Sequence, residues 1–198
     1  MKLLILRHGE AVEAAEVGGR DQARTLTRRG RRVIGQVAAA LRAWELRPAT
    51  IWSSRWARAW ETAGIVAKAL GDLEIQAQPA LEAPRDVESM LKCLDAASKL
   101  PSLLLVGHNP SLEELAGCLV SDSGQAAIKL KKGGLAILEI AGPIGPGCGV
   151  LEALWAPGAL KALADAGKTK GERGVKPGIR KAKSVGRATG AGITKAGL

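Results

Sequence analysis

The segment Leu3-Leu4-Ile5-Leu6-Arg7-His8-Gly9-Glu10 places charged and polar side chains directly after a run of aliphatic residues. Such a run is typical of a strand buried on both faces of a parallel sheet. Neighbouring strand side chains point to opposite faces, so Arg7 and His8 can serve one pocket only where the chain leaves the strand. Gly9 permits that departure and a close approach of a ligand to the backbone. Because ligands bind at the carboxyl ends of strands in open α/β sheets, we expect His8 in a binding site.

The rest of the chain alternates between strand-like and helix-like patterns, which predicts an α/β domain with a mainly parallel central sheet. Thr27 is a candidate N-cap for a helix whose apolar stripe runs through Val33, Val37, Ala40, Leu41 and Trp44. Asn109 and Pro110 are the expected N-cap and first residue of a later helix. Strands are expected at 50–53, 74–78, 103–106, 135–140 and 150–155, and further helices around 59–70, 87–94 and 112–119.

Only two histidines occur in the chain, and both follow buried strands. His108 comes directly after Leu103 to Gly107, and the predicted helix that follows would point free N–H groups and its positive dipole end at the same sheet edge. Arg55 and Arg58, just after the strand at 50–53, can reach this edge as well. The sequence therefore predicts an anion site built from histidine and arginine.

Phosphoryl transfer requires this set of groups, because charge spreads over three equatorial oxygens while the attacking and leaving atoms lie in line. A guanidinium offers a planar fork that matches phosphate oxygens. A neutral imidazole, with a reference pKa of about 6.5, can act as the nucleophile near pH 7. The second histidine can then be the cation beside the transferring group.

Four segments in this order resemble the histidine phosphatase superfamily, branch 1, and within it the small SixA-type phosphohistidine phosphatases. They are Arg7-His8-Gly9, Arg24-Thr25-Leu26-Thr27 with Gly30, Ser54 through Arg58-Ala59 to Thr62, and Gly107-His108-Asn109-Pro110. The resemblance implies a phosphoglycerate mutase-like, three-layer α/β/α sandwich over residues 1–160. It also implies chemistry that needs neither a metal nor a cofactor.

The resemblance further implies that His8 becomes transiently phosphorylated and that Arg7, Arg58 and His108 complete the phosphate pocket, with Asn109 as a further binding residue. Arg58 is preferred to Arg55 because the family places arginine four positions after the serine that matches Ser54. Glu82 is the candidate proton donor, since larger relatives carry an acidic residue in that region. The expected substrate is phosphohistidine in a protein, and the alternative is a small phosphomonoester.

The basic charge of the chain belongs to its end. From Gly158 onward there are 10 Lys and Arg against 2 Asp and Glu, whereas the whole chain has a net charge of +10. Residues 166–198 are rich in Gly, Lys and Arg and are expected to be a disordered tail. A hypothesis of another class is therefore a polyanion-binding module that acts through this tail, at least as a non-specific contact.

Apolar runs fall far short of the roughly 20 residues that a membrane span requires, and no secretory signal follows Met1. We therefore expect a cytoplasmic protein without membrane contact. Three cysteines without C-x-x-C spacing indicate neither a disulfide framework nor a zinc site.

Overall fold

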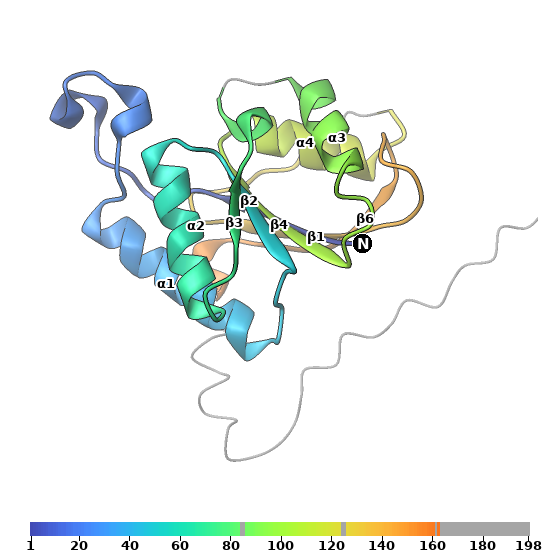
Figure 1. The fold of residues 1–198 in the computed structure, drawn as a ribbon, viewed down its shortest axis with the longest axis horizontal. Coiled ribbons are helices and arrows are strands. Elements are labelled where there is room, and N and C mark those ends of the chain that lie inside the picture. The colour runs from blue at the N-terminus through green and yellow to red at the C-terminus, as the bar shows by residue number, and fades with distance from the viewer. Residues whose placement is uncertain (84–85, 124–125, 161, 163–198) are drawn as a thin grey trace, which may run out of the picture.

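The computed structural model describes residues 1–83, 86–123, 126–160 and 162 of the chain, and its centre is a six-stranded sheet (Figure 1). The strand order is β3-β2-β4-β1-β5-β6. The strands are β1 (Lys2–Arg7), β2 (Thr50–Ser53), β3 (Ile75–Ala77), β4 (Ser102–Gly107), β5 (Leu135–Ile140) and β6 (Gly149–Trp155). The first four pair in parallel, while β5 and β6 are antiparallel. This confirms the mainly parallel sheet.

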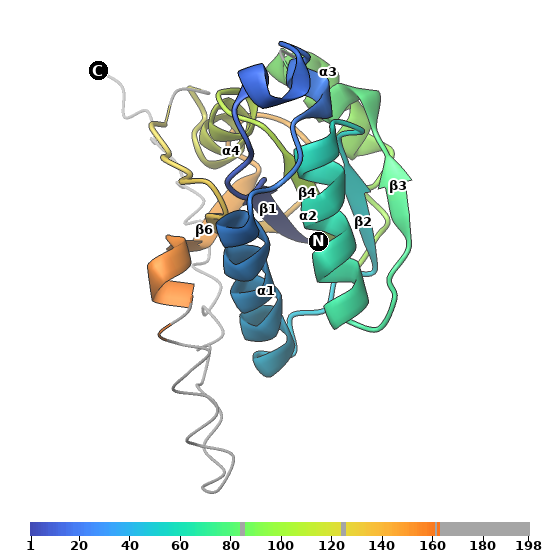
Figure 2. The same cartoon turned by 90° about the vertical axis from the view of Figure 1, so that its left-hand side faces the viewer.

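Four helices cover the two faces of the sheet and complete three layers (Figures 1 and 2). On one face, α1 (Arg28–Ala43) packs beside α2 (Ala57–Ala69), and on the other α3 (Val87–Asp95) packs beside α4 (Ser111–Val120). Alternate residues of β1 enter the two cores: Leu4 and Leu6 face α1 and α2, whereas Leu3 and Ile5 face α3 and α4. The predicted sandwich is therefore confirmed, and burial on both faces explains the aliphatic run in β1.

Two details of the predicted helices are wrong. In α1 the predicted positions Val37, Ala40 and Leu41 are fully buried, but in the first turn the buried side chain is Ile34, and Val33 is half-buried. Asn109 does not cap α4: Pro110 is the N-cap residue, and the peptide bond between the two is cis. The side chain of Asn109 bonds elsewhere, in the site described below.

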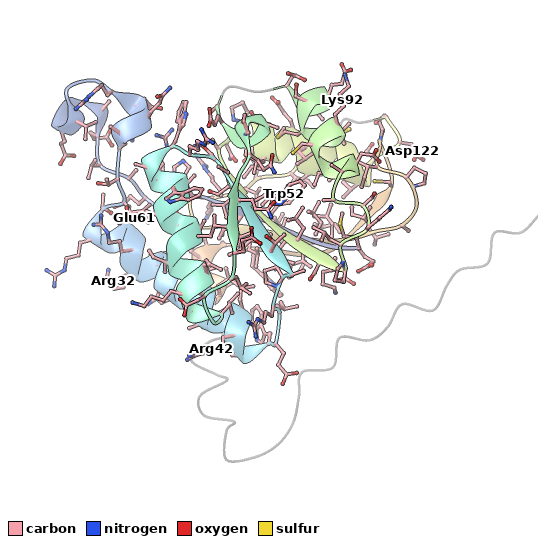
Figure 3. The ribbon with its side chains drawn as sticks, viewed as in Figure 1. Arg32, Arg42, Trp52, Glu61, Lys92 and Asp122 are labelled. Atoms are coloured by element: carbon pink, nitrogen blue, oxygen red, sulfur yellow. The ribbon has the colours of Figure 1, made fainter. Side chains whose placement is uncertain are left out.

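Residues 11–26 leave the sheet edge after β1 and return to it before α1 (Figure 2). They contain two short 3-10 helices, η1 (Ala14–Val17) and η2 (Asp21–Ala23), and an isolated bridge between Ala11 and Leu26 closes the base of this excursion. Glu61 of α2 lies against the start of α1, where it accepts a hydrogen bond from the Leu26 amide at 2.7 Å and pairs with Arg31 (Figure 3). The excursion is thereby fixed at both of its ends.

The predicted N-cap of α1 is confirmed, and it attaches the helix to the end of β1. Thr27 Oγ1 accepts a hydrogen bond from the Gly30 amide at 2.9 Å, and the Thr27 amide donates to the Glu10 carbonyl at 2.9 Å. A Cβ atom at Gly30 would collide with the backbone oxygen of Glu10. The matching segment from Arg24 to Gly30 thus has a structural basis, which is the close approach of α1 to the loop that follows His8.

The expected tail, residues 166–198, lies outside the described residues. A short 3-10 helix, η3 (Pro79–Leu81), follows β3. Within the described part of the chain, no helix is both long enough and apolar enough to cross a membrane. Cys93, Cys118 and Cys148 are free.

Candidate active site

His8 lies at the carboxyl end of β1 with its ring held by two hydrogen bonds. Nδ1 lies 2.7 Å from the Gly9 carbonyl oxygen, which can only accept, so Nδ1 carries the proton. Nε2 then has a free lone pair, and it accepts a hydrogen bond from Arg58 Nε at 3.2 Å. Burial, with the nearby charges of His108, Arg58 and Arg7, lowers the pKa of His8 to about 3. The ring is therefore neutral near pH 7, with a nucleophilic nitrogen at Nε2.

His108 lies beside His8 because the strands that precede them are neighbours. Arg7 of β1 is paired with Gly107 of β4, so the two histidines follow at the same edge, with ring centroids 5.0 Å apart. His108 Nε2 is 3.0 Å from Ser54 Oγ, at the end of β2. Burial, followed by the charges of Arg58 and Arg7, lowers the pKa of His108 to about 3. His108 is therefore neutral near pH 7 in this structure, and its role as the cation beside the transferring group stays a prediction.

Arg58 connects the nucleophile to the excursion. Its side chain is 6% exposed, and besides His8 it bonds Asp21 twice: Nη1 donates to the Asp21 carbonyl at 2.6 Å and Nη2 to the carboxylate at 2.9 Å. Asp21 Oδ1 also accepts from Arg24 Nη1 at 2.8 Å. The hydrogen bonds from Arg24 and Arg58 hold the pKa of Asp21 below its ordinary value, so this carboxylate is ionised near neutral pH.

Arg7 and Asn109 meet at the backbone before β5. Arg7 Nη1 and Asn109 Nδ2 both donate to the Leu130 carbonyl, at 2.9 and 3.0 Å. Among the described residues, three buried side-chain atoms lack a hydrogen-bond partner within the protein, namely Arg7 Nε, His108 Nδ1 and Asn109 Oδ1. All three belong to residues that the sequence placed in the site. Buried polar groups usually form hydrogen bonds within the protein. Several buried groups without such a bond in one site are therefore available to bind a ligand.

A cavity of about 400 Å³ brings these side chains together. Its described lining consists of Arg7, His8, Asp21, Arg24, Trp56, Arg58, Ala83, His108, Asn109, Pro110 and Lys132. Four of the residues are cationic and one is acidic, which suits a small anion with several oxygens. In the described part of the chain, no group of three His, Cys, Asp or Glu side chains is arranged to hold a metal ion.

Solved structures with a similar fold include proteins named as phosphatases. The protein histidine phosphatase SixA, in complex with tungstate, is 24% identical, with a TM-score of 0.72 over 81% of this chain and all of that one. A protein of Agrobacterium tumefaciens to which the name phosphohistidine phosphatase SixA has been assigned is 28% identical, with a TM-score of 0.68 over 79% of this chain and 97% of that one. An Escherichia coli protein assigned as an alpha-ribazole-5'-P phosphatase is 19% identical, with a TM-score of 0.63 over 79% of this chain and 98% of that one.

A search of curated proteins finds no match. Residues 3–83, which run from β1 past η3, match the sequence model of the histidine phosphatase superfamily, branch 1. Over this range the chain is similar to the histidine phosphatase superfamily, branch 1. The resemblance seen in the sequence is confirmed, and the fold is like that of proteins named SixA.

The structure brings five of the six sequence-predicted site residues to one cavity. Arg58 lines it, whereas Arg55 is exposed and lies outside the described lining. Glu82 is half-buried and is also absent from that lining, although its neighbour Ala83 is part of it. Its role as proton donor stays a prediction.

Gly9 is also closely packed, and its expected role in letting a ligand approach the backbone stays a prediction. A Cβ atom there would lie 2.8 Å from Ile34 Cγ1 and 3.1 Å from Leu26 Cδ2, so a larger residue would have to displace these side chains. The Gly9 amide donates to Thr62 Oγ1 at 3.1 Å, and Thr62 in turn donates to the Arg58 carbonyl at 2.7 Å. Thr62 therefore connects the loop that carries His8 to the helix that carries Arg58.

Proposed function

We propose that this chain is a histidine phosphatase that removes the phosphoryl group from phosphohistidine in a protein, through a covalent intermediate on His8. The observation that carries the proposal is the state of the His8 ring. Its Nδ1 proton is held by the Gly9 carbonyl, and its unprotonated Nε2 lies at a cavity with Arg7, Arg58 and His108. A neutral, oriented imidazole beside an anion pocket is what nucleophilic attack on phosphorus requires.

In the first step His8 Nε2 attacks phosphorus, the bond from phosphorus to the leaving atom breaks, and the phosphoryl group passes to His8. The guanidinium groups of Arg7 and Arg58, together with Asn109 and His108, hold the phosphoryl oxygens. Negative charge brought by the phosphoryl group raises the pKa of His108, which then becomes a better hydrogen-bond donor. In the second step water attacks the phosphoryl group, releases inorganic phosphate and restores the neutral ring.

We choose a protein phosphohistidine as the substrate because its leaving group needs no proton donor. Asp21, the one acidic residue in the described lining, is ionised and therefore cannot donate a proton to an alkoxide. An imidazole leaves as a neutral ring when its other nitrogen is already protonated, and so needs no strong acid. The likeness to proteins named SixA agrees with this choice. A small phosphomonoester is the alternative, and one protein of similar fold is named for alpha-ribazole-5'-P.

The test is to trap the intermediate on protein without a histidine tag, because the chain then carries only two histidines. The enzyme is mixed with a phosphohistidine-containing carrier protein, quenched at alkaline pH and digested with trypsin. Cleavage places His8 in the peptide 8–20 and His108 in the peptide 100–129, so mass spectrometry separates the two sites. We expect phosphate on peptide 8–20, and none on it in His8→Ala. Phosphate on peptide 100–129 alone, or full activity in His8→Ala, would refute the proposal.

The substrate class is tested by comparing the rate of turnover of the same carrier protein with the rates for a panel of sugar phosphates and nucleotides.

Deletion of residues 166–198 separates the phosphatase hypothesis from the polyanion-binding hypothesis. We expect the shortened protein to keep its turnover, because no residue of the described lining lies beyond Lys132. A polyanion-binding module would lose salt-sensitive binding instead.

A further inference from the structure

A second cavity of about 570 Å³ adjoins the first and shares two of its lining residues. Asp21 and Trp56 line both, and the second is completed by Arg20, Gln22 and Ala23 of the excursion. The phosphoryl group belongs with the cationic side chains of the first cavity. The leaving group attached to that phosphoryl group has to extend past Asp21 and Trp56 to reach the second cavity.

The Asp21 carboxylate can exchange partners without detaching the excursion. Its side chain is 44% exposed, and it pairs with Arg58 and Arg24. Arg58 also donates to the Asp21 backbone carbonyl, so the excursion stays attached when the carboxylate turns away. A phosphoryl dianion competes for the same guanidinium groups and repels the carboxylate. Phosphate binding therefore directs the Asp21 carboxylate toward the leaving side.

Trp56 presents the apolar surface that a flat ring requires. The Arg58 guanidinium carbon lies 4.8 Å from the Trp56 ring centroid, and the His108 ring lies 4.9 Å from it on a tilted plane. The ring already contacts one cation and one imidazole within the site. Aromatic faces attract cations, so the same ring suits a protonated imidazole.

We propose that Asp21 and Trp56 form a leaving-group subsite that selects a protonated imidazole ring. This inference rests on the proposed function and names the residues that recognise the ring. The Asp21 carboxylate accepts a hydrogen bond from the N–H of the phosphoimidazolium, and Trp56 contacts its face. When His8 Nε2 forms its bond to phosphorus, the ring's P–N bond breaks and its electron pair stays on that ring nitrogen. The ring leaves neutral with its single N–H, so no proton has to move.

A paired carboxylate favours the protonated ring, which is the form that leaves readily. A phosphomonoester gains nothing from Asp21, because its leaving oxygen bears no proton to donate and the ionised carboxylate has none to give. The subsite thus distinguishes phosphoimidazolium substrates from phosphomonoesters, although both carry the same phosphoryl group.

The experiment compares phosphoimidazole with p-nitrophenyl phosphate, whose phenolate leaves without a proton. The measured quantity is the ratio of kcat/KM for phosphoimidazole to kcat/KM for p-nitrophenyl phosphate. We expect Asp21→Asn to lower this ratio about 10- to 100-fold, the range for loss of a hydrogen bond to a charged group. Trp56→Leu should lower it severalfold. The matched control is Asp72→Asn, which removes an exposed aspartate after α2 at the opposite edge of the sheet and should leave the ratio at the wild-type value.

A ratio within about twofold of wild type in both Asp21→Asn and Trp56→Leu would overturn the inference and leave the proposed function intact. If circular dichroism shows that one of the two variants does not fold, the other decides. Failure of the proposed function is a separate result, since wild-type enzyme would then hydrolyse monoesters and leave the phosphohistidine carrier and phosphoimidazole untouched.

Discussion

Arg58 donates from Nε to Nε2 of His8 at 3.2 Å, so the guanidinium occupies the lone pair of the nucleophile. The same guanidinium is held on its other side by Asp21. We expect a phosphoryl group that enters the cavity to replace the carboxylate as a partner of Arg58 and to free Nε2 of His8. Arg58 is thus placed both to orient the His8 ring before binding and to hold phosphoryl oxygens afterwards.

Replacement of Arg58 by alanine should lower kcat/KM for p-nitrophenyl phosphate on the order of 100-fold or more, because a preorganised charge beside the transferring group is lost. Arg58→Lys should recover little of this, since an ammonium lacks the planar fork that reaches His8 and Asp21 together. Arg55→Ala is the matched control: it removes an exposed arginine three residues earlier in the chain and should retain activity. Equal losses in Arg55→Ala and Arg58→Ala would contradict this assignment.

The pKa of each histidine, lowered to about 3, predicts that neither ring titrates between pH 5 and 8. Protein without a histidine tag shows just two ring Cε1–H signals in a heteronuclear NMR spectrum, both from the site. Their shifts should stay constant over this range, whereas the same signals in urea should titrate near 6.5. A transition near pH 6.5 in the folded protein would show that the rings are accessible to water.

The same lowered pKa values fix the sign of the effect on stability. Between about pH 3 and 6.5 the unfolded chain binds protons at both histidines while the folded chain does not. The free energy of unfolding should therefore fall as pH falls through this window, by up to about 1.4 kcal/mol per pH unit for each histidine. Urea unfolding at pH 5 and 7 measures the difference. His8→Gln should reduce the slope, and an unchanged slope would argue against the burial of His8 as a neutral ring.

Whether a site residue can be predicted from the sequence depends on whether a local pattern marks it. His8 and His108 are predictable because each follows an aliphatic strand, and the end of such a strand can be recognised in a single sequence. That β1 and β4 are neighbours was not visible, because strand order comes from tertiary packing. Arg58 is predicted only through the family resemblance, which places an arginine four positions after the serine that matches Ser54.

Asp21 was missed because nothing local marks it. It lies 37 residues from Arg58, in an irregular excursion without hydrophobic periodicity, and only the closure at Ala11 and Leu26 brings it to the cavity. The Leu130 carbonyl, which holds Arg7 and Asn109, is a backbone group and leaves no side-chain signal. Ile34 and Val33 are adjacent apolar residues, so only the contact with the sheet decides which one is buried.

Thr62→Val should separate support of the His8 loop from general stability. The change keeps the shape of the side chain but leaves the buried Gly9 amide without its acceptor, at a cost of about 1–3 kcal/mol. Because the loop carries His8, kcat/KM should fall at least about tenfold. Thr50→Val is the matched control, since Thr50 is also buried and its hydroxyl donates to the Glu74 carbonyl at the far edge of the sheet. It should lose some stability and no activity; full activity in Thr62→Val would contradict the role of Thr62.

Two glycines of α1 offer the sharpest test of the packing that holds the site. Gly30→Ala places a methyl group against the backbone oxygen of Glu10, which cannot move without shifting the chain after His8. We expect a loss of about 1–3 kcal/mol in the free energy of unfolding together with reduced turnover. At Gly35, in the same helix, a Cβ atom meets nothing within 4 Å, so Gly35→Ala should stabilise the protein by about 0.5–1 kcal/mol without affecting turnover. Urea unfolding and p-nitrophenyl phosphate hydrolysis measure both effects, and a stabilised or fully active Gly30→Ala variant would show that α1 does not approach Glu10 as closely as described.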